Sequence, residues 1–188
     1  MNRISGLEER IRAHVNDAFL YEGYFTDDLN TWQTLCAAMD ILGDTCLALL
    51  QFEENGIGRS LGEKYINLYG LFQSFILQQD SIKELHDIFV GTKLNLHDID
   101  EFEKLRRIRN MMTGHPISKH GLRTYLSRPT MNDNGFELIS WNVKTSQNEV
   151  LIIHLPTLYS PYKDKAVELL ETTSTNQIKR FPRLKEYD

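Results

Sequence analysis

The sequence contains little cysteine and little proline, and both absences limit the architecture. There are two cysteines and five prolines among 188 residues. Cys36 and Cys46 fall within one expected helix, where their separation is too large for a disulfide bond, so both are expected to be reduced core residues. No Pro/Ser-rich linker, internal repeat or low-complexity tract divides the chain. A single domain covering residues 1–188 is therefore expected.

The sequence also lacks a long apolar run and an excess of basic residues. No run approaches the length of a bilayer span, and the segment from Met1 to Glu9 lacks the apolar core of a signal peptide. A soluble, cytoplasmic protein without a membrane contact is expected. The formal net charge of -5 disfavours broad electrostatic binding to nucleic acid. RNA contact would need a local basic cluster, for which the candidates are Lys104, Arg106, Arg107, Arg109, Lys119, Arg123 and Arg128.

Apolar residues recur at helical spacing through most of the chain. Ser60 and Glu63 match a capping box, Asp98 and Glu101 give a second cap signal, and Pro161 is expected in the first turn of the last helix. The short break at residues 55–58 predicts an antiparallel hairpin between the two longest helices. The helices are predicted at about residues 4–21, from Asp28 or Asn30 to residue 54, and at 60–89, 99–113 and 160–178.

Residues that favour strands dominate after Gly121. Turn signals at 132–135 and 145–148 separate three short segments. These segments, at about 123–128, 136–143 and 150–155, predict an antiparallel meander, which is small enough to need support from the helices. The expected fold is therefore mainly α. It is an antiparallel helical bundle, about 4–115 plus 160–178, with a β appendage at about 121–156.

The best candidate for chemistry is the segment Arg109-Asn110-Met111-Met112-Thr113-Gly114-His115-Pro116. Arginine is a permanent cation whose planar fork matches phosphate, and histidine gains and loses a proton near neutral pH. Five residues separate Arg109 from His115, and a polar residue follows the arginine. This pattern, behind a helical hairpin, resembles the signature of the HEPN superfamily.

The resemblance implies a metal-independent endoribonuclease, in the setting of a toxin or a defence component. In catalytic HEPN proteins the motif lines a cleft between two protomers, which implies a homodimer here. His115 would act as general acid and base, and Arg109 would stabilise charge on the phosphate. Asn110 and Thr113 would support them. RNA would contact Arg106, Arg107, Lys119 and Arg123, and no metal or cofactor is expected.

Other interpretations remain open. Many HEPN proteins have lost activity, so the chain is alternatively a catalytically inactive dimerisation or partner-binding module, with an antitoxin or a nucleotidyltransferase-fold protein as its partner. In a purely structural interpretation, Arg109 forms a salt bridge to a carboxylate on a neighbouring helix and His115 caps the helix end. A helical scaffold with no small-molecule site is the third alternative. The environment of Arg109 distinguishes these interpretations, because a catalytic arginine must face a cleft.

Overall fold

The computed structural model describes residues 1–114 and 121–183. It is mainly helical with one small antiparallel sheet, which confirms the expected mainly-α fold with a β appendage. The helices are α1 (Asn2–Asp17), α2 (Leu29–Asn55), α3 (Leu61–Val90), α4 (Asp100–Arg109) and α5 (Leu155–Arg180). The strands are β1 (Leu122–Leu126), β2 (Gly135–Asn142) and β3 (Gln147–His154), in the spatial order β1-β2-β3. Two π-helical turns, Tyr21–Phe25 and Asn110–Gly114, follow α1 and α4.

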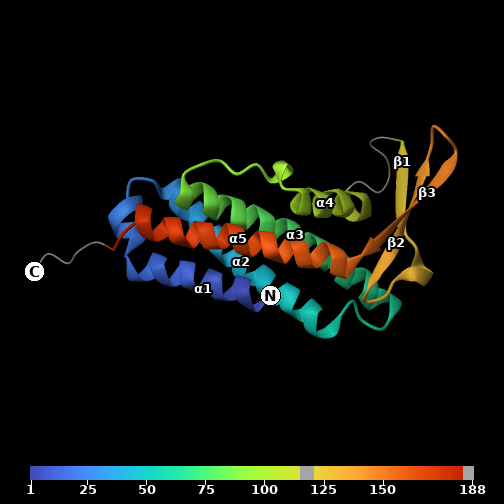
Figure 1. Ribbon diagram of the computed structural model, residues 1–188, viewed down its shortest axis with the longest axis horizontal. Helices are drawn as coiled ribbons and strands as arrows, with labels where there is room; N and C mark the ends of the chain where they lie inside the picture. The colour runs from blue at the N-terminus through green and yellow to red at the C-terminus, as the bar shows by residue number, and fades with distance from the viewer. Residues whose placement is uncertain (115–120, 184–188) are drawn as a thin grey trace, which may run out of the picture.

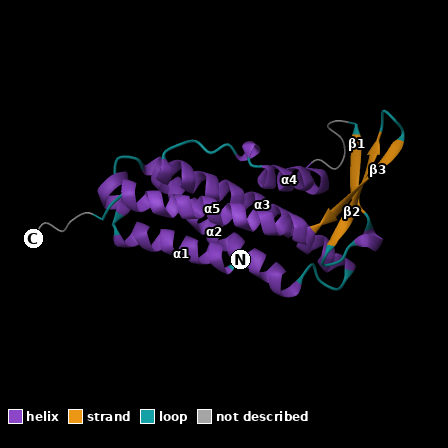
Figure 2. Cartoon of the chain, in the orientation of Figure 1, coloured by secondary structure: helices purple, strands orange, loops and turns teal. Residues whose placement is uncertain are grey.

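The four long helices lie side by side as a bundle (Figure 1). Helix α2 packs against α3, α3 against α5, and α1 against both α5 and α2, so the four helices enclose one core. The shorter helix α4 packs on α3 and α5, outside this bundle. The sheet stands across one end of the bundle, beside the C-terminal end of α4 (Figure 2). The candidate motif therefore begins where bundle and sheet meet.

Each helix of the α2–α3 hairpin begins at a side-chain cap. Asp28 accepts a hydrogen bond from the Thr31 N–H at 3.1 Å, and Ser60 with Glu63 forms the predicted capping box. Between the helices, Gly56 adopts a positive φ of 66°, and a Cβ there would collide with the Asp133 carboxylate. That carboxylate accepts a hydrogen bond from the Ile57 N–H at 2.9 Å. The hairpin turn is thereby tied to the segment that precedes β2.

A buried polar chain joins the three longest helices. The Tyr162 hydroxyl of α5 donates to Gln78 Oε1 of α3 at 2.8 Å, and Gln78 Nε2 donates to Thr45 Oγ1 of α2 at 3.2 Å. Tyr162 and Gln78 are both completely buried. Burial raises the pKa of the Tyr162 hydroxyl, which keeps it protonated as a donor. Because unpaired polar groups are costly in a core, this chain fixes how the helices face one another.

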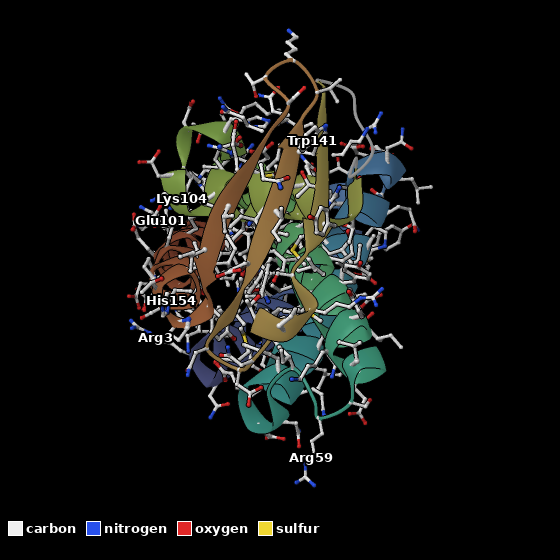
Figure 3. All side chains as sticks on the ribbon, turned by 90° about the vertical axis from the view of Figure 1, so that its right-hand side faces the viewer. Arg3, Arg59, Glu101, Lys104, Trp141 and His154 are labelled. Atoms are coloured by element: carbon white, nitrogen blue, oxygen red, sulfur yellow. The ribbon has the colours of Figure 1, made fainter. Side chains whose placement is uncertain are left out.

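The two faces of the sheet differ in what they contact. The inner face packs on the bundle through buried side chains, which include Leu126, Phe136, Leu138 and Ile153. The outer face points away from the bundle, as the view in Figure 3 shows. By the strand register, the outer face carries Arg123 and Tyr125 of β1, Glu137, Ile139 and Trp141 of β2, and Val150 and Ile152 of β3.

Several predicted boundaries are wrong. Helix α5 begins at Leu155, because Pro156 occupies its first turn directly after β3, and Pro161 lies inside the helix rather than at its start. Asp98 does not cap α4. It belongs to a 3-10 turn, Leu96–Asp98, and Ile99 precedes the helix with no side-chain cap. The first helix ends at Asp17 rather than near Tyr21, and a π-helical turn replaces part of the predicted loop.

Helix α2 is long and apolar enough to cross a membrane by length and composition, contrary to the expectation from the sequence. A buried core helix passes the same test. Its apolar stripe, which includes Leu35, Met39, Leu42 and Leu49, is buried in the core of the bundle. Packing within this protein accounts for the apolar character of that stripe.

We predict that Tyr162→Phe lowers the free energy of unfolding by about 1–3 kcal/mol, because Gln78 Oε1 loses its donor in a dry core. Urea denaturation followed by circular dichroism measures this change. Tyr65→Phe is the matched control, since the half-buried Tyr65 hydroxyl has no hydrogen-bond partner among the described residues. An equal loss in both variants would contradict the role of the buried chain.

The connection from α3 to α4 is organised by Asp87, whose side chain is only 3% exposed. Its carboxylate accepts the Leu94 N–H at 2.7 Å and pairs with Lys83 and Lys93 at 2.9 and 3.3 Å. Burial alone would raise the pKa of Asp87. The hydrogen bonds from Lys83, Leu94 and Lys93 outweigh burial and lower that pKa below its ordinary value.

Because its folded-state pKa is lowered, Asp87 contributes stability that is fully present above the unfolded-state pKa and lost as pH falls through the folded-state pKa. We expect Asp87→Asn to be less stable than wild type near neutral pH, with the difference shrinking on acidification. Urea denaturation between about pH 6 and about pH 3 tests this. A difference that stays constant over that range would show that the Asp87 charge is not responsible.

Candidate functional site

The C-terminal end of α4 changes its helical geometry at the start of the motif. The α-helix ends at Arg109, and Asn110–Gly114 continues as a π-helical turn. The Thr113 hydroxyl donates to the Arg109 carbonyl at 3.1 Å, so its hydrogen bond goes to the backbone. π-Helical turns occur frequently at functional sites, where they change the direction of side chains. Nothing in the residue pattern signals this turn, and the sequence predicted an ordinary helix end.

Arg109 is half-buried and has no acidic partner within the described parts of the chain. Its Nη1 donates to Asn110 Oδ1 at 2.9 Å, and its Nε is buried with no acceptor among residues 1–114 and 121–183. A guanidinium in such surroundings retains unused donors and an uncompensated charge. The salt bridge expected from a purely structural arginine is therefore absent from the described residues. Asn110 holds the arginine from the adjacent position.

The other arginines of α4 have different surroundings. Arg106 pairs with Asp80 of α3, and its side chain is 20% exposed. Arg107 is exposed, as is Lys104 one turn earlier, and neither is in an ion pair among the described residues. Basic side chains in a last helical turn also interact favourably with the helix dipole. Of the residues predicted to bind RNA, Arg107 is thus free to meet a ligand, whereas Arg106 is already neutralised.

Not all of the predicted site residues are brought together. His115 and Lys119 lie outside the described residues. Arg123 is exposed on the outer face of the sheet, opposite Trp141 in the strand register, whereas the inner face is the one directed toward the bundle. The fold therefore groups Arg106, Arg107, Arg109, Asn110 and Thr113 at one helix end and places Arg123 on another surface.

A groove of about 440 Å³ runs beside this helix end, between α4, β3 and the start of α5. Lys104, Arg107 and Ile108 line one side of the groove. Residues 151–154 of β3, with Thr157 and Leu158 of α5, line the other side. Lys104 and His154 lie along this side of the sheet in Figure 3. The groove combines the exposed cations Lys104 and Arg107 with apolar walls, and sequence reasoning missed it because its walls come from segments far apart in the chain.

A larger pocket, of about 750 Å³, lies between the end of α2 and the start of α5. Glu53 there accepts hydrogen bonds from Lys163 at 2.9 Å and from the Met1 amino group at 3.0 Å. Burial alone would raise the pKa of Glu53, but these hydrogen bonds outweigh it and lower that pKa. Burial, reinforced by the Glu53 charge, raises the pKa of Tyr159. The Glu53 and Lys163 charges compensate each other, so this pocket is a weaker candidate than the end of α4.

The described residues contain no cluster of histidine, cysteine and acidic side chains that would hold a metal ion. Cys36 and Cys46 are both free thiols, and burial raises the pKa of Cys46 to about 12, which makes it unreactive near neutral pH. Comparisons with protein-family models, curated proteins and solved structures gave no match to this chain. The candidate site is thus defined by its own geometry at the end of α4.

We predict that Arg106 and Arg107 contribute differently to stability. Arg106→Ala should lower the free energy of unfolding by about 1 kcal/mol, since it removes a partly buried ion pair and its packing. The exposed neighbour Arg107→Ala should change it by less than about 0.5 kcal/mol. Urea denaturation of both variants checks the contrast. Equal effects would mean that the pairing with Asp80 does not hold α4 onto α3.

Proposed function

We propose that this protein is a HEPN-like, metal-independent endoribonuclease with its site at the C-terminal end of α4. The observation that carries the proposal is the environment of Arg109. Among the described residues this half-buried arginine has no carboxylate partner and its buried Nε has no acceptor; Arg106 on the same helix also has a buried, unpaired Nε, but its guanidinium is paired with Asp80. Keeping a guanidinium partly desolvated without a carboxylate costs free energy, and such a cost is typical of groups that bind a ligand. An RNA phosphate matches that guanidinium in charge and geometry.

The chemistry proposed for the motif is an internal phosphoryl transfer. The ribose 2′-hydroxyl attacks the adjacent phosphorus, the bond to the 5′-oxygen breaks, and a 2′,3′-cyclic phosphate and a 5′-hydroxyl result. A proton leaves the 2′-oxygen and another is delivered to the 5′-oxygen, and His115 is the residue whose pKa range suits these transfers. Arg109 stabilises the charge that develops on the phosphate oxygens. Asn110 orients Arg109 through the contact between their side chains.

Binding of RNA is proposed to be local rather than extended. The net charge of -5 repels a polyanion over most of the surface. Lys104 and Arg107 are exposed on the same short helix as Arg109, but at about 100° per residue they project from the other side of that helix, so RNA bound at Arg109 would have to pass around the helix end to meet them. An RNA segment held only there makes few phosphate contacts, so its affinity should depend weakly on salt concentration.

A second candidate function is favoured by the outer face of the sheet. Three apolar side chains there are more than half exposed: Tyr125 at 54%, Val150 at 56% and Ile152 at 66%. Contiguous exposed apolar residues are typical of interaction surfaces. This observation supports a catalytically inactive, partner-binding module as the alternative. Sheet variants would then abolish the biological effect of the protein, whereas Arg109→Ala would leave it intact.

We expect the purified protein to cleave a mixed RNA pool in the presence of EDTA. Arg109→Ala should reduce the cleavage rate by about 10²–10³-fold, as removal of a transition-state donor does, and His115→Ala should reduce it at least as much. Analysis of the product ends should show the cyclic phosphate. Arg10→Ala, which removes an exposed arginine of α1, is the control for charge and should retain the wild-type rate.

The folding of each variant is checked by circular dichroism before the rates are compared. If wild type cleaves RNA and Arg109→Ala cleaves it equally fast, the assignment of the site is overturned. Cleavage that disappears with EDTA and returns with a divalent cation would overturn the metal-independent mechanism. Both results are distinct from a loss of activity through unfolding.

A further inference from the structure

Among the described residues no strand pairs with the outer edge of β3, which is therefore a free edge, and the hydrogen bonds of the sheet show which backbone groups point out from it. The Leu155 N–H donates to the Asn134 carbonyl at 2.9 Å, so the backbone groups of Leu155 point toward the β2 side. Because these groups alternate along a strand, those of Ile153, Leu151 and Glu149 also point toward β2. The Ser127 N–H donates to the Glu137 carbonyl at 2.9 Å, so the backbone groups of Glu137 point toward β1. Those of its neighbours Phe136 and Leu138 then point toward β3, which agrees with the assignment for β3. The N–H and C=O groups of Asn148, Val150 and Ile152 therefore face away from the sheet.

This edge has no lysine, no proline and no bulge, which are among the usual protections of an edge strand. Natural proteins cover edges or interrupt them with lysine, proline or a bulge, because a bare apolar edge pairs with other strands. The β3 sequence, Gln-Asn-Glu-Val-Leu-Ile-Ile-His, contains no lysine and no proline, and its pairing with β2 is continuous. Val150, Leu151 and Ile152 are all exposed. An apolar, unprotected edge of this kind is suited to receive another strand.

We propose that the free edge of β3 pairs with β3 of a second copy of this chain, antiparallel and centred on Val150. In this register Val150 lies opposite the partner's Val150, and Asn148 lies opposite the partner's Ile152. All three residues with outward backbone groups then exchange reciprocal hydrogen bonds, as a two-fold axis requires. The two sheets become one continuous sheet, and the exposed Val150 side chains meet across the axis.

Charge complementarity favours a second copy as the occupant. In this register Glu149 lies opposite the partner's Leu151, and both side chains are on the inner face of the sheet. Leu151 lines the groove together with Lys104 and Arg107 of α4. Each exposed Glu149 is thereby brought to the exposed Lys104 and Arg107 of the other protomer. The contact is made twice, once on each side of the axis, and it involves charges of opposite sign both times.

The pairing also has a consequence for the candidate site. A two-fold axis that relates paired edge strands is perpendicular to the sheet, so the inner faces of both sheets lie on the same side. Both α4 helices, each ending at Arg109, are then on that side of the continuous sheet. The pairing does not depend on nuclease activity, because it is made by backbone groups and by side chains outside the motif.

Sedimentation velocity and light scattering of the full chain measure the pairing. We expect wild type to show twice the chain mass of 21.9 kDa at micromolar concentration. Val150→Lys places two ammonium groups opposite each other at the axis, and it should weaken the dimer more than about tenfold. Leu47→Lys is the matched control, since Leu47 is an apolar residue of α2 with 69% exposure. It should leave the dimer unchanged.

A charge-reversal series tests the register. Glu149→Lys alone, and the double variant Lys104→Glu with Arg107→Glu, should each weaken the dimer, because like charges then meet across the interface. Mixing these two proteins should form a heterodimer in which both contacts again have opposite charges. Combining all three substitutions in one chain should restore the homodimer. Glu9→Lys, an exposed charge reversal on α1, should have no effect.

A wild-type mass of one chain at every concentration up to about 100 μM would overturn the pairing. If Val150→Lys still forms the dimer and Leu47→Lys does not, the β3 pairing is also overturned, because the dimer then forms through α2. Monomeric protein that still cleaves RNA would overturn the pairing alone, whereas a β3-dependent dimer without cleavage would support the pairing and count against the nuclease. The two proposals therefore fail through different measurements.

Discussion

The arrangement of the bundle depends on the buried amide of Gln78. An amide in a dry core must satisfy both its donor and its acceptor, and here the partners come from different helices, Tyr162 of α5 and Thr45 of α2. A rotation of either helix about its axis would break one of these hydrogen bonds. Helix α4 packs on α3 and α5, so the surface that supports the motif is set by the same constraint. The surrounding apolar contacts supply stability, and the amide selects one packing among many.

Three arginines on one short helix occupy three environments, and tertiary structure decides which of them keeps an available charge. Asp80 of α3 neutralises Arg106, Arg107 projects into solvent, and Arg109 lies where the α-helix changes to a π-helical turn. A surface of net negative charge thus retains a small basic region next to a groove with apolar walls. The exposed edge of β3 forms one wall of that groove. The candidate site and the candidate interface are therefore neighbouring features of one structural junction.

The sequence predicted helices α2 and α3 almost to the residue, because both begin at side-chain caps, Asp28 and Ser60, and are followed by glycine. It misplaced the start of α5, because Ser160-Pro161 matches the pattern of a helix start. In the structure β3 continues to His154 and α5 begins at the next residue. At about 100° per residue Arg109 lies only about 40° from the buried Leu105 around the helix, so periodicity alone indicates the half-buried position of Arg109. Periodicity does not indicate that Arg109 lacks a carboxylate partner within residues 1–114 and 121–183, because that depends on Asp80 being positioned to meet Arg106 instead.

The pairing of α1 with α5 has a consequence for synthesis on the ribosome. The Gln177 side chain donates to the Ile11 carbonyl at 3.0 Å, a contact that joins residues 166 positions apart. The α2–α3 hairpin is local and can form while the chain is still emerging, but the core stays open until α5 leaves the exit tunnel. At a typical elongation rate of about 5–20 residues per second, the apolar faces of the first three helices wait several seconds for their last partner. During that interval the nascent chain exposes apolar surface of the kind that aggregates.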